Sequence, residues 1–299
     1  MKVLILGATG NLGRLTAVAL SAGHSDVSLK LTSHREAGKT SLREAFPRAE
    51  VVGADWYDES SLRAAVSGVD KVLMVTPDFV TDETAVTPNV IRAIKGAGGI
   101  RQLLRFIAIP PGFTINDLSP AQLATRCGAT LHVVAKPLLD TSGLPVTYVN
   151  AACWIMFNLP WFMAEDVRLS GRLLMPALAD SPRRWIAETD IADVFAKILT
   201  DNAVAHIGRE YLVTGQQRYT FAQVAELLSN VLCKTVTYVD DDQPLRRAMG
   251  EAFDVLMTYF THETKAYDAV PATRTVETLL GHPQLGLREY IERNKALFL

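Results

Sequence analysis

The sequence predicts an α/β fold, with a Rossmann-like doubly wound parallel sheet and a smaller, mostly helical C-terminal lobe. Two observations predict this fold. An apolar run at residues 3–6 ends in a turn with glycines at positions 7, 10 and 13, and such a glycine-rich turn from strand to helix is typical of Rossmann folds. Short apolar runs then alternate with helical patterns as far as residue 150, which indicates βαβ units and a parallel sheet.

The first 150 residues divide into short buried strands and amphipathic helices. Strands of a sheet that is covered on both faces are short apolar runs, whereas helices show apolar residues every three or four positions. These patterns predict strands at residues 3–6, 27–32, 51–54, 72–76, 103–109 and 146–149. They predict helices at residues 12–22, 38–46, 60–66, 87–97 and 121–142. Right-handed crossovers between such strands give the doubly wound arrangement.

The second half follows a different pattern, because aromatic and proline-rich stretches at residues 154–182 interrupt the alternation. Strands are predicted at residues 185–187, 210–213 and 236–239, and Asp190 is predicted to cap a helix that runs to Leu199. Thr220 and Gln223 form a capping-box pattern that opens a helix to Leu232, and the remainder is mostly helical. No clear linker separates the halves. We therefore expect a Rossmann lobe at residues 1–150 and an interwoven substrate-binding lobe at residues 151–299.

Composition and charge exclude several classes of protein. A net charge of −2 with scattered basic residues provides no electrostatic attraction to nucleic acid or to an anionic membrane. The longest apolar stretch, residues 151–164, is too short to span a bilayer. The 3 cysteines have no paired spacing, which argues against a disulfide framework and a metal site and favours the cytoplasm. We expect a small-molecule partner, with monomer and homodimer both open.

The glycine turn is predicted to bind a dinucleotide. Backbone N–H groups at the start of the helix, together with the helix dipole, form a site for the pyrophosphate. Gly7 permits the turn, Gly10 lets a phosphate approach the backbone, and Gly13 lets the helix pack on the strand. The predicted contacts are Gly7, Thr9, Gly10, Asn11, Leu12 and Gly13. The alternative is a glycine turn that serves packing alone.

The residues after the second strand decide which cofactor is predicted. NAD sites place an acidic residue there, whereas this strand leads into Ser33, Arg35 and then Lys39. Arg35 can hold a 2′-phosphate through two hydrogen bonds, Lys39 adds positive charge, and Ser33 can donate a further hydrogen bond. These residues predict NADP(H). The alternative is a solvated Arg35 paired with Glu36, which would repel the phosphate if it pointed inward.

Further cofactor contacts are predicted after the third and fourth strands. Asp55 can accept a hydrogen bond from the adenine amine, and Trp56 can cover the adenine ring. Thr76 and Pro77 end the fourth strand at the carboxyl edge of the sheet, where ligands bind in this architecture. Helix capping by Asp55 and Thr76 is an equally good interpretation of each residue alone.

An aromatic run follows the sixth strand and is predicted to lie beside the nicotinamide end of the cofactor. Its rings can stack on a flat aromatic substrate, and Phe113 can face them across the cleft. The alternative, an inter-lobe core or a dimer face, has the same composition. Asn158 is harder to place in a core because a buried amide needs partners, and it can anchor the loop through backbone hydrogen bonds. The candidate substrate residues are Phe113, Trp154, Phe157, Asn158 and Trp161.

Five segments together carry a family resemblance: GATGNLG, GADWYDESSL, SGLPVTYVNA, IAETDIADVFAKIL and EYLVTGQQRYTFAQVAELLS. They resemble the NmrA-like proteins, which are atypical members of the extended short-chain dehydrogenase/reductase superfamily, and among these the quinone-oxidoreductase and triphenylmethane-reductase branch. The resemblance implies NADP(H) binding, a Rossmann lobe and a C-terminal lobe that closes a substrate cleft. The family includes reductases and also regulators that bind the dinucleotide without turning it over.

The sequence departs from the catalytic pattern of that superfamily. Short-chain dehydrogenases use a Tyr-x-x-x-Lys pair, but the predicted helix at residues 121–142 contains no tyrosine, and the fifth strand ends without the usual hydroxyl residues. The family's lysine position falls on His132, and the lysine of this helix is Lys136. His132 can donate a proton because its ordinary pKa lies near neutrality, and Lys136 can orient the nicotinamide ribose. The alternative gives both residues structural or solvent-exposed roles.

The predicted function is transfer of a hydride from NADPH to a hydrophobic, aromatic or quinone-like small molecule. Hydride transfer requires a positioned electrophile in a dry pocket, and a quinone can take its proton later from water. Such a reaction tolerates the missing tyrosine. The alternative is a non-catalytic NADP(H)-binding sensor that regulates a partner, and an isomerase that uses the cofactor structurally is a third class.

Overall fold

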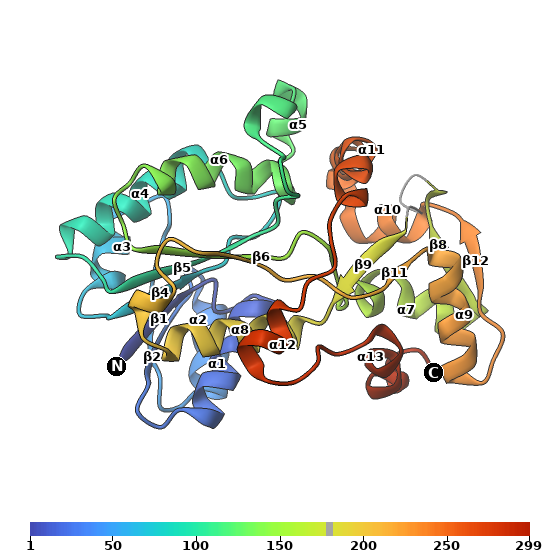
Figure 1. Ribbon diagram of the computed structural model, residues 1–299, viewed down its shortest axis with the longest axis horizontal. Coiled ribbons are helices and arrows are strands. Elements are labelled where there is room, and N and C mark those ends of the chain that lie inside the picture. The colour runs from blue at the N-terminus through green and yellow to red at the C-terminus, as the bar shows by residue number, and fades with distance from the viewer. Residues whose placement is uncertain (178–181) are drawn as a thin grey trace.

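A seven-stranded parallel sheet organises the first part of the computed structural model (Figure 1), which describes residues 1–177 and 182–299. The strand order is β10-β6-β5-β4-β1-β2-β3, and every neighbouring pair is parallel. This is the Rossmann order with one strand added. The strands are β1 (Lys2–Leu6), β2 (Ser28–Thr32), β3 (Glu50–Val52), β4 (Lys71–Met74), β5 (Gln102–Ile107), β6 (Val146–Asn150) and β10 (Glu210–Leu212). The predicted fold class is confirmed.

Helices cover both faces of this sheet (Figure 1). One face packs against α1 (Asn11–Gly23), α2 (Glu36–Ala45), α8 (Glu188–Thr200) and α12 (Thr275–Leu280). The other face packs against α3 (Glu59–Val66), α4 (Glu83–Gly96) and α6 (Ala129–Asp140). Each face has its own hydrophobic core. Because α8, α12 and β10 come from the second half of the sequence, that half completes the central sheet.

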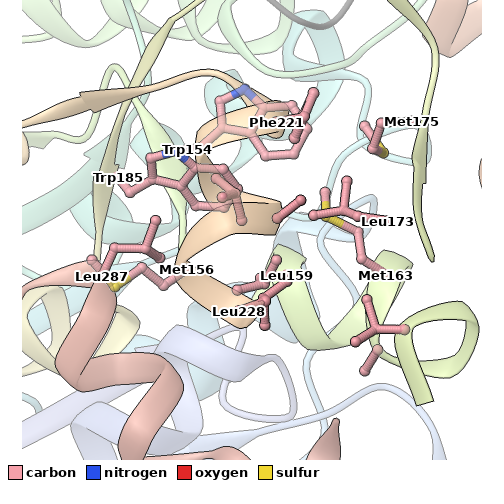
Figure 2. Packing of buried hydrophobic residues seen from close by; sticks show 14 of the residues in the cluster. Trp154, Met156, Leu159, Met163, Leu173, Met175, Trp185, Phe221, Leu228 and Leu287 are labelled. Carbon is pink, nitrogen blue, oxygen red and sulfur yellow. The ribbon is translucent and has the colours of Figure 1, made fainter. Parts of the chain in front are cut away.

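The rest of the second half forms a separate hydrophobic cluster beside the sheet. Figure 2 shows Trp154, Trp185 and Phe221 in this cluster together with Leu228 and Met163. Its helices are α7 (Asn158–Ser170), α9 (Phe221–Leu232), α10 (Gln243–Met249), α11 (Phe253–Asp268) and α13 (Leu287–Arg293). Its strands are β7 (Trp154–Ile155), β8 (Arg172–Met175), β9 (Arg183–Ile186), β11 (Arg218–Tyr219) and β12 (Thr237–Asp240), paired as β11-β9-β7 and β12-β8.

The helix predicted at residues 121–142 is in fact two helices. The helix α5 (Pro120–Ala124) ends before a turn at residues 125–128, and α6 begins at Ala129. Arg126 and Gly128 have φ values of 50° and 49° in this turn, which interrupts a right-handed helix. Sequence periodicity missed the break because Leu123, Cys127 and Leu131 continue the apolar spacing across it. The break gives α6 an N-terminus of its own.

Two further helix predictions had different outcomes. The capping box at the start of α9 is confirmed, because Thr220 and Gln223 each bond to the other's backbone N–H. The predicted cap by Asp190 is wrong, because α8 begins two residues earlier, at Glu188. The Asp190 carboxylate instead accepts a hydrogen bond from the Leu285 backbone N–H at 2.8 Å, which ties the C-terminal segment to α8.

Within residues 1–177 and 182–299, no helix combines the length and apolar character that crossing a bilayer requires.

Candidate active site

A cleft of about 860 Å³ opens at the carboxyl edge of the central sheet. Its walls come from the loops that follow β1, β2, β3, β4, β5 and β6, and from α7 and α11. The predicted site residues that line it are Gly7, Thr9, Gly10, Asn11, Leu12, Ser33, Arg35, Asp55, Trp56, Thr76, Pro77, His132, Trp154, Phe157, Asn158 and Trp161. Gly13, Lys39, Phe113 and Lys136 lie outside this lining. The structure therefore brings most of the predicted residues to one continuous surface.

The glycine turn at the start of α1 has the geometry of an anion site. Gly7 has a φ of 93°, and a Cβ atom on it would lie 2.3 Å from the Val75 carbonyl oxygen. A Cβ atom on Gly13 would lie 2.3 Å from the Gly7 carbonyl oxygen, so α1 can approach β1 closely because position 13 has no side chain. Gly10 precedes the first helical residue, Asn11. The unbonded N–H groups of the first turn of α1 therefore face the cleft, as a pyrophosphate requires.

The Arg35 side chain is exposed at the adenosine end of the cleft. Glu36, its expected alternative partner, pairs instead with Lys39, and the Lys39 hydrogen bond holds the pKa of Glu36 below its usual value. Among the side chains that the structure describes, no carboxylate forms an ion pair with Arg35. The guanidinium is thus free to meet a phosphate, while Lys39 acts by neutralising Glu36 outside the cleft lining.

Several other residues line the adenosine end of the cleft near Arg35. The Ser33 hydroxyl donates to the Arg35 carbonyl oxygen and accepts from the Arg35 N–H, both at 3.2 Å, so it fixes the turn that carries Arg35. Asp55 is exposed and accepts a hydrogen bond from the Tyr57 N–H at 2.9 Å. Trp56 is half-buried against the α3–α4 core. His34 also lines the cleft, and sequence reasoning did not include it.

A buried ion pair lies under the middle of the cleft. Arg105 on β5 is 0 % exposed and pairs with Glu83 on α4. The same guanidinium nitrogen donates to the Thr76 hydroxyl at 2.8 Å, and Thr76 donates to Glu83 at 2.9 Å. The Thr76 hydroxyl therefore already has both a hydrogen-bond donor and an acceptor within the protein. A charged residue inside the apolar run QLLRFI is the sequence signal for this network.

His132 faces this network. The imidazole is 2 % exposed, and its Nδ1 lies 3.5 Å from the Arg105 guanidinium. Burial, followed by the positive charge of Arg105, holds the pKa of His132 well below its usual value. The ring is therefore neutral at pH 7, with Nδ1 as the acceptor and Nε2 protonated. The neutral ring can donate a hydrogen bond through Nε2, and a proton-donor role for His132 stays a prediction.

Lys136 and Phe113 lie away from the cleft. Lys136 is one turn beyond His132 on α6, but its amine pairs with Asp140 at 2.8 Å and lies 4.6 Å from the centre of the Tyr148 ring. Phe113 packs against the α3–α4–α6 core. The structure does not support the role in orienting the cofactor predicted for Lys136 or the substrate contact predicted for Phe113.

The aromatic run divides into a core part and a cleft part. Trp154 is 7 % exposed and packs against Trp185 and Phe221, with ring centres 5.3 Å and 5.5 Å away (Figure 2). Trp161 is 55 % exposed, and its ring stacks with those of Phe157 and Phe162. We therefore assign Trp154 mainly to the core, and the stack around Trp161 to the open wall of the cleft.

Asn158 is the first residue of α7 and lies in the cleft wall. Within the described part of the chain its side-chain amide has no hydrogen-bond partner. The expectation that this amide anchors the loop is therefore corrected. A half-buried amide beside three aromatic rings is suited to bind a polar group of a ligand.

Sequence reasoning missed the contribution of α11 to the cleft. Tyr259 and Tyr267 both line it, with hydroxyl oxygens 3.2 Å apart. Phe79, in the loop after β4, also lines it while packing against the second-half core. Phe79 has a φ of 67°, an uncommon conformation for a bulky residue that is often found at functional sites. Only the tertiary fold brings these residues to the sheet edge.

Several sequence relatives cover most of this chain. The NAD(P)H azoreductase of Xenophilus azovorans is 30% identical over 238 residues, which are 79% of this chain and 76% of that protein. Quinone oxidoreductase 2 of Escherichia coli (strain K12) is 25% identical over 296 residues, which are 97% of each chain. Its crystal structure with NADPH matches this fold with a TM-score of 0.76 and 24% identity, over 99% of this chain and 100% of that chain.

A transcriptional regulator has the same fold. The crystal structure of NmrA, a negative transcriptional regulator, in complex with NADP matches with a TM-score of 0.73 and 20% identity, over 100% of this chain and 98% of that chain. The sequence model of the NmrA-like family matches residues 1–278 of this chain. The match spans the glycine turn, the central sheet and most of the second half. The chain therefore belongs to the NmrA-like family.

Proposed function

We propose that this protein is an NADPH-dependent oxidoreductase that transfers a hydride to a hydrophobic, aromatic or quinone-like small molecule. One observation carries the proposal. A single continuous cleft joins a helix N-terminus, an arginine without an ion-pair partner among the described residues, and a wall of stacked aromatic rings. The first two features suit a phosphorylated dinucleotide, and the third suits a flat apolar substrate.

NADP(H) is the cofactor that fits the described residues. The first turn of α1, with Gly10, Asn11 and Leu12, holds the pyrophosphate. Arg35 holds the 2′-phosphate, because a planar guanidinium can donate two parallel hydrogen bonds to a phosphate. NADPH supplies the hydride when it is bound. The order of the strands then directs its nicotinamide end toward β5 and β6.

The substrate side of the cleft is apolar with few polar groups. Phe157 and Trp161 provide ring faces for stacking, and the Asn158 amide can orient an oxygen of the substrate. His132 contributes a neutral N–H in a buried position. The relatives named for azo and quinone reduction act on molecules with such flat conjugated systems. These features support an aromatic or quinone-like substrate over a sugar or a polar acid.

A sensor that binds NADP(H) and regulates a partner is the second candidate. The predicted helix lacks the Tyr-x-x-x-Lys pair, and Lys136 lies outside the cleft. The fold of the regulator NmrA with NADP is the same. The open aromatic wall favours the reductase, because a sensor needs no apolar pocket beside the nicotinamide.

The test is turnover of NADPH with a panel of quinones, azo dyes and aromatic carbonyl compounds, followed by the absorbance of the reduced nicotinamide. Binding of NADPH is measured in parallel by calorimetry. Oxidation of NADPH that depends on one class of acceptor supports the proposal. Tight NADPH binding with no oxidation by any acceptor supports the sensor instead. A Trp161→Ala variant should raise KM for the acceptor while leaving NADPH affinity unchanged.

A further inference from the structure

Two tyrosines from α11 reach the carboxyl edge of the central sheet. The Tyr259 hydroxyl accepts a hydrogen bond from the Ala129 backbone N–H at 3.0 Å and lies 3.2 Å from the Tyr267 hydroxyl. The Tyr267 hydroxyl donates to the Ala108 carbonyl oxygen at 3.1 Å. Both phenols are buried, and both line the cleft. The C-terminal half thus holds two hydroxyl groups against the Rossmann lobe.

These hydroxyls lie where the nicotinamide end of a dinucleotide must extend. Ala108 directly follows β5, and Ala129 begins the helix that leads to β6. In the sheet order, β5 and β6 lie on the opposite side of β1 from β2, whose end carries Arg35. A dinucleotide with its adenosine at Arg35 and its pyrophosphate at the glycine turn therefore extends its other end toward the tyrosine pair.

The N-terminus of α6 is suited to stabilise a phenolate at Tyr259. Ala129 is the first residue of this 12-residue helix, and its N–H points at the phenol oxygen. An unpaired N–H at a helix start and the positive end of the helix dipole both favour an anion. The break between α5 and α6 creates this N-terminus, which a continuous helix would not have.

Gly128 makes room for the phenol. It precedes α6 with a φ of 49°, and a Cβ atom on it would lie 2.1 Å from the Tyr259 hydroxyl oxygen and 2.6 Å from Cζ. A residue with a side chain at this position would push Tyr259 away from the helix. The close contact between the start of α6 and the Tyr259 hydroxyl therefore depends on the glycine at position 128.

We propose that Tyr259 is the proton donor of the reduction and that Tyr267 is its positioning residue, an inference that rests on the proposed reductase function. The substrate class is a conjugated carbonyl compound, including quinones. As the substrate gains a hydride, the electron pair of its C=O π bond moves to oxygen. The Tyr259 O–H bond breaks while a substrate O–H bond forms. The resulting phenolate is stabilised by the Ala129 N–H, and it regains a proton from water.

The test compares Tyr259→Phe with wild type, using the quinone or aromatic carbonyl compound that reacts fastest. Loss of a general acid should lower kcat about 100-fold or more, with the Kd for NADPH unchanged by calorimetry. The charged groups nearest the pair are Arg183, 5.5 Å from the centre of the Tyr267 ring, and Asp78, which accepts a hydrogen bond from the Gly128 N–H. The wild-type kcat should fall at high pH as the donor loses its proton, and this fall should be absent from the variant. Tyr267→Phe should keep the fall at high pH and lose about tenfold in kcat.

Two further variants keep the outcome clear. Tyr211→Phe removes a hydroxyl that bonds to His206 outside the cleft and should leave kcat unchanged. Gly128→Ala should lower kcat in the wild type but have little further effect in the Tyr259→Phe background, because it acts on kcat by displacing the Tyr259 hydroxyl, which that variant already lacks. If Tyr259→Phe binds NADPH and keeps kcat within about threefold, Tyr259 is not the donor and the reductase assignment stands. If wild type binds NADPH but reduces no acceptor, both proposals fail.

Discussion

Individual side chains in this cleft have their roles set by their neighbours. Glu36 would oppose a phosphate, but Lys39 pairs with it and leaves Arg35 available. His132 would be a candidate acid in water, but burial and Arg105 keep it neutral. The Thr76 hydroxyl is bound by Arg105 and Glu83. In each case the residue type was visible in the sequence, whereas the partner that decides its chemistry was not.

Arg35→Ala should remove the preference for NADPH over NADH. Losing a charge-assisted, two-fold contact to a phosphate costs about 1.5–3 kcal/mol, which weakens NADPH binding roughly 10- to 150-fold. NADH has no 2′-phosphate, so its Kd should stay the same. Calorimetric titration of both nucleotides measures the change. Arg43→Ala, an exposed arginine later on α2, is the control and should leave both Kd values unchanged.

Asp190 should make the protein less stable as the pH rises from about 4 to 6. Burial raises the pKa of its carboxyl from the usual 3.8 to about 6, so the folded state binds more protons than the unfolded state in that interval. The free energy of unfolding therefore falls through this window, by about 3 kcal/mol in total, and is level above it.

Asp190→Asn should abolish that slope and be more stable than wild type above pH 6, since the amide oxygen can still accept from the Leu285 N–H. Urea unfolding at pH 4, 5, 6 and 7 measures the effect. Asp193→Asn on the same helix provides a comparison, because burial also raises the pKa of that more exposed carboxyl. Its effect on the pH dependence of the unfolding free energy should have the same sign and be smaller. If the unfolding free energies of Asp190→Asn and wild type changed with pH in parallel, Asp190 would not be the source of the slope.

At the scale of the elements, the approach of α1 to β1 determines whether the anion site exists. The helix start is aimed at the cleft because Gly13 lies directly on the Gly7 carbonyl. Similarly, the turn at residues 125–128 directs α6 toward the second half of the chain.

Gly13→Ala should both destabilise the protein and weaken NADPH binding. Its Cβ atom would lie 2.3 Å from a backbone oxygen, which cannot rotate away, so α1 must move. Overpacking of this kind costs about 1–3 kcal/mol. Gly23→Ala at the end of the same helix meets nothing within 4 Å and should be neutral or slightly stabilising. Chemical denaturation and NADPH titration of the two variants give the comparison. Equal stability of both would show that α1 can shift without cost.

Much of the element pattern was predictable from the sequence, because the strands of the central sheet are short apolar runs between helical periods. The glycine turn and the second strand likewise indicated the cofactor end of the cleft. Periodicity could not detect the break before α6, where Cys127 and Leu131 continue the apolar spacing. The short strand β7 was missed because two residues carry no period. Tyr259 and Tyr267 were missed because more than 100 residues separate them from Ala129 and Ala108.

At the scale of the whole molecule, both halves of the chain form the cleft. The Rossmann strands supply its floor, and α7 and α11 supply its apolar wall. Phe79 reaches from the loop after β4 into the second-half core, and Arg126 in the turn before α6 pairs with Asp82 near the same loop. A ligand that fills the cleft therefore contacts segments from most of the chain.

Saturating NADPH should raise the melting temperature by about 5–10 °C. A ligand at 100 times its Kd stabilises the folded state by about 2.7 kcal/mol, and each kcal/mol corresponds to about 2–4 °C in a protein of this size class. NADH at the same concentration should give a smaller increase, because it lacks the phosphate that meets Arg35. Differential scanning fluorimetry measures both. An increase that is the same for the two nucleotides would place the 2′-phosphate away from Arg35.

The return of the chain to the central sheet has a consequence for biosynthesis. Strand β10 pairs with β6, and α8 packs on α1, yet both come after residue 187. While the ribosome is still translating the segment between β6 and β10, β6 is an open edge of the sheet and the face that α8 later covers is partly exposed. Such edges and faces pair with other chains. The nascent polypeptide thus remains vulnerable to aggregation until nearly three quarters of it has emerged, and chaperone protection matters most during that interval.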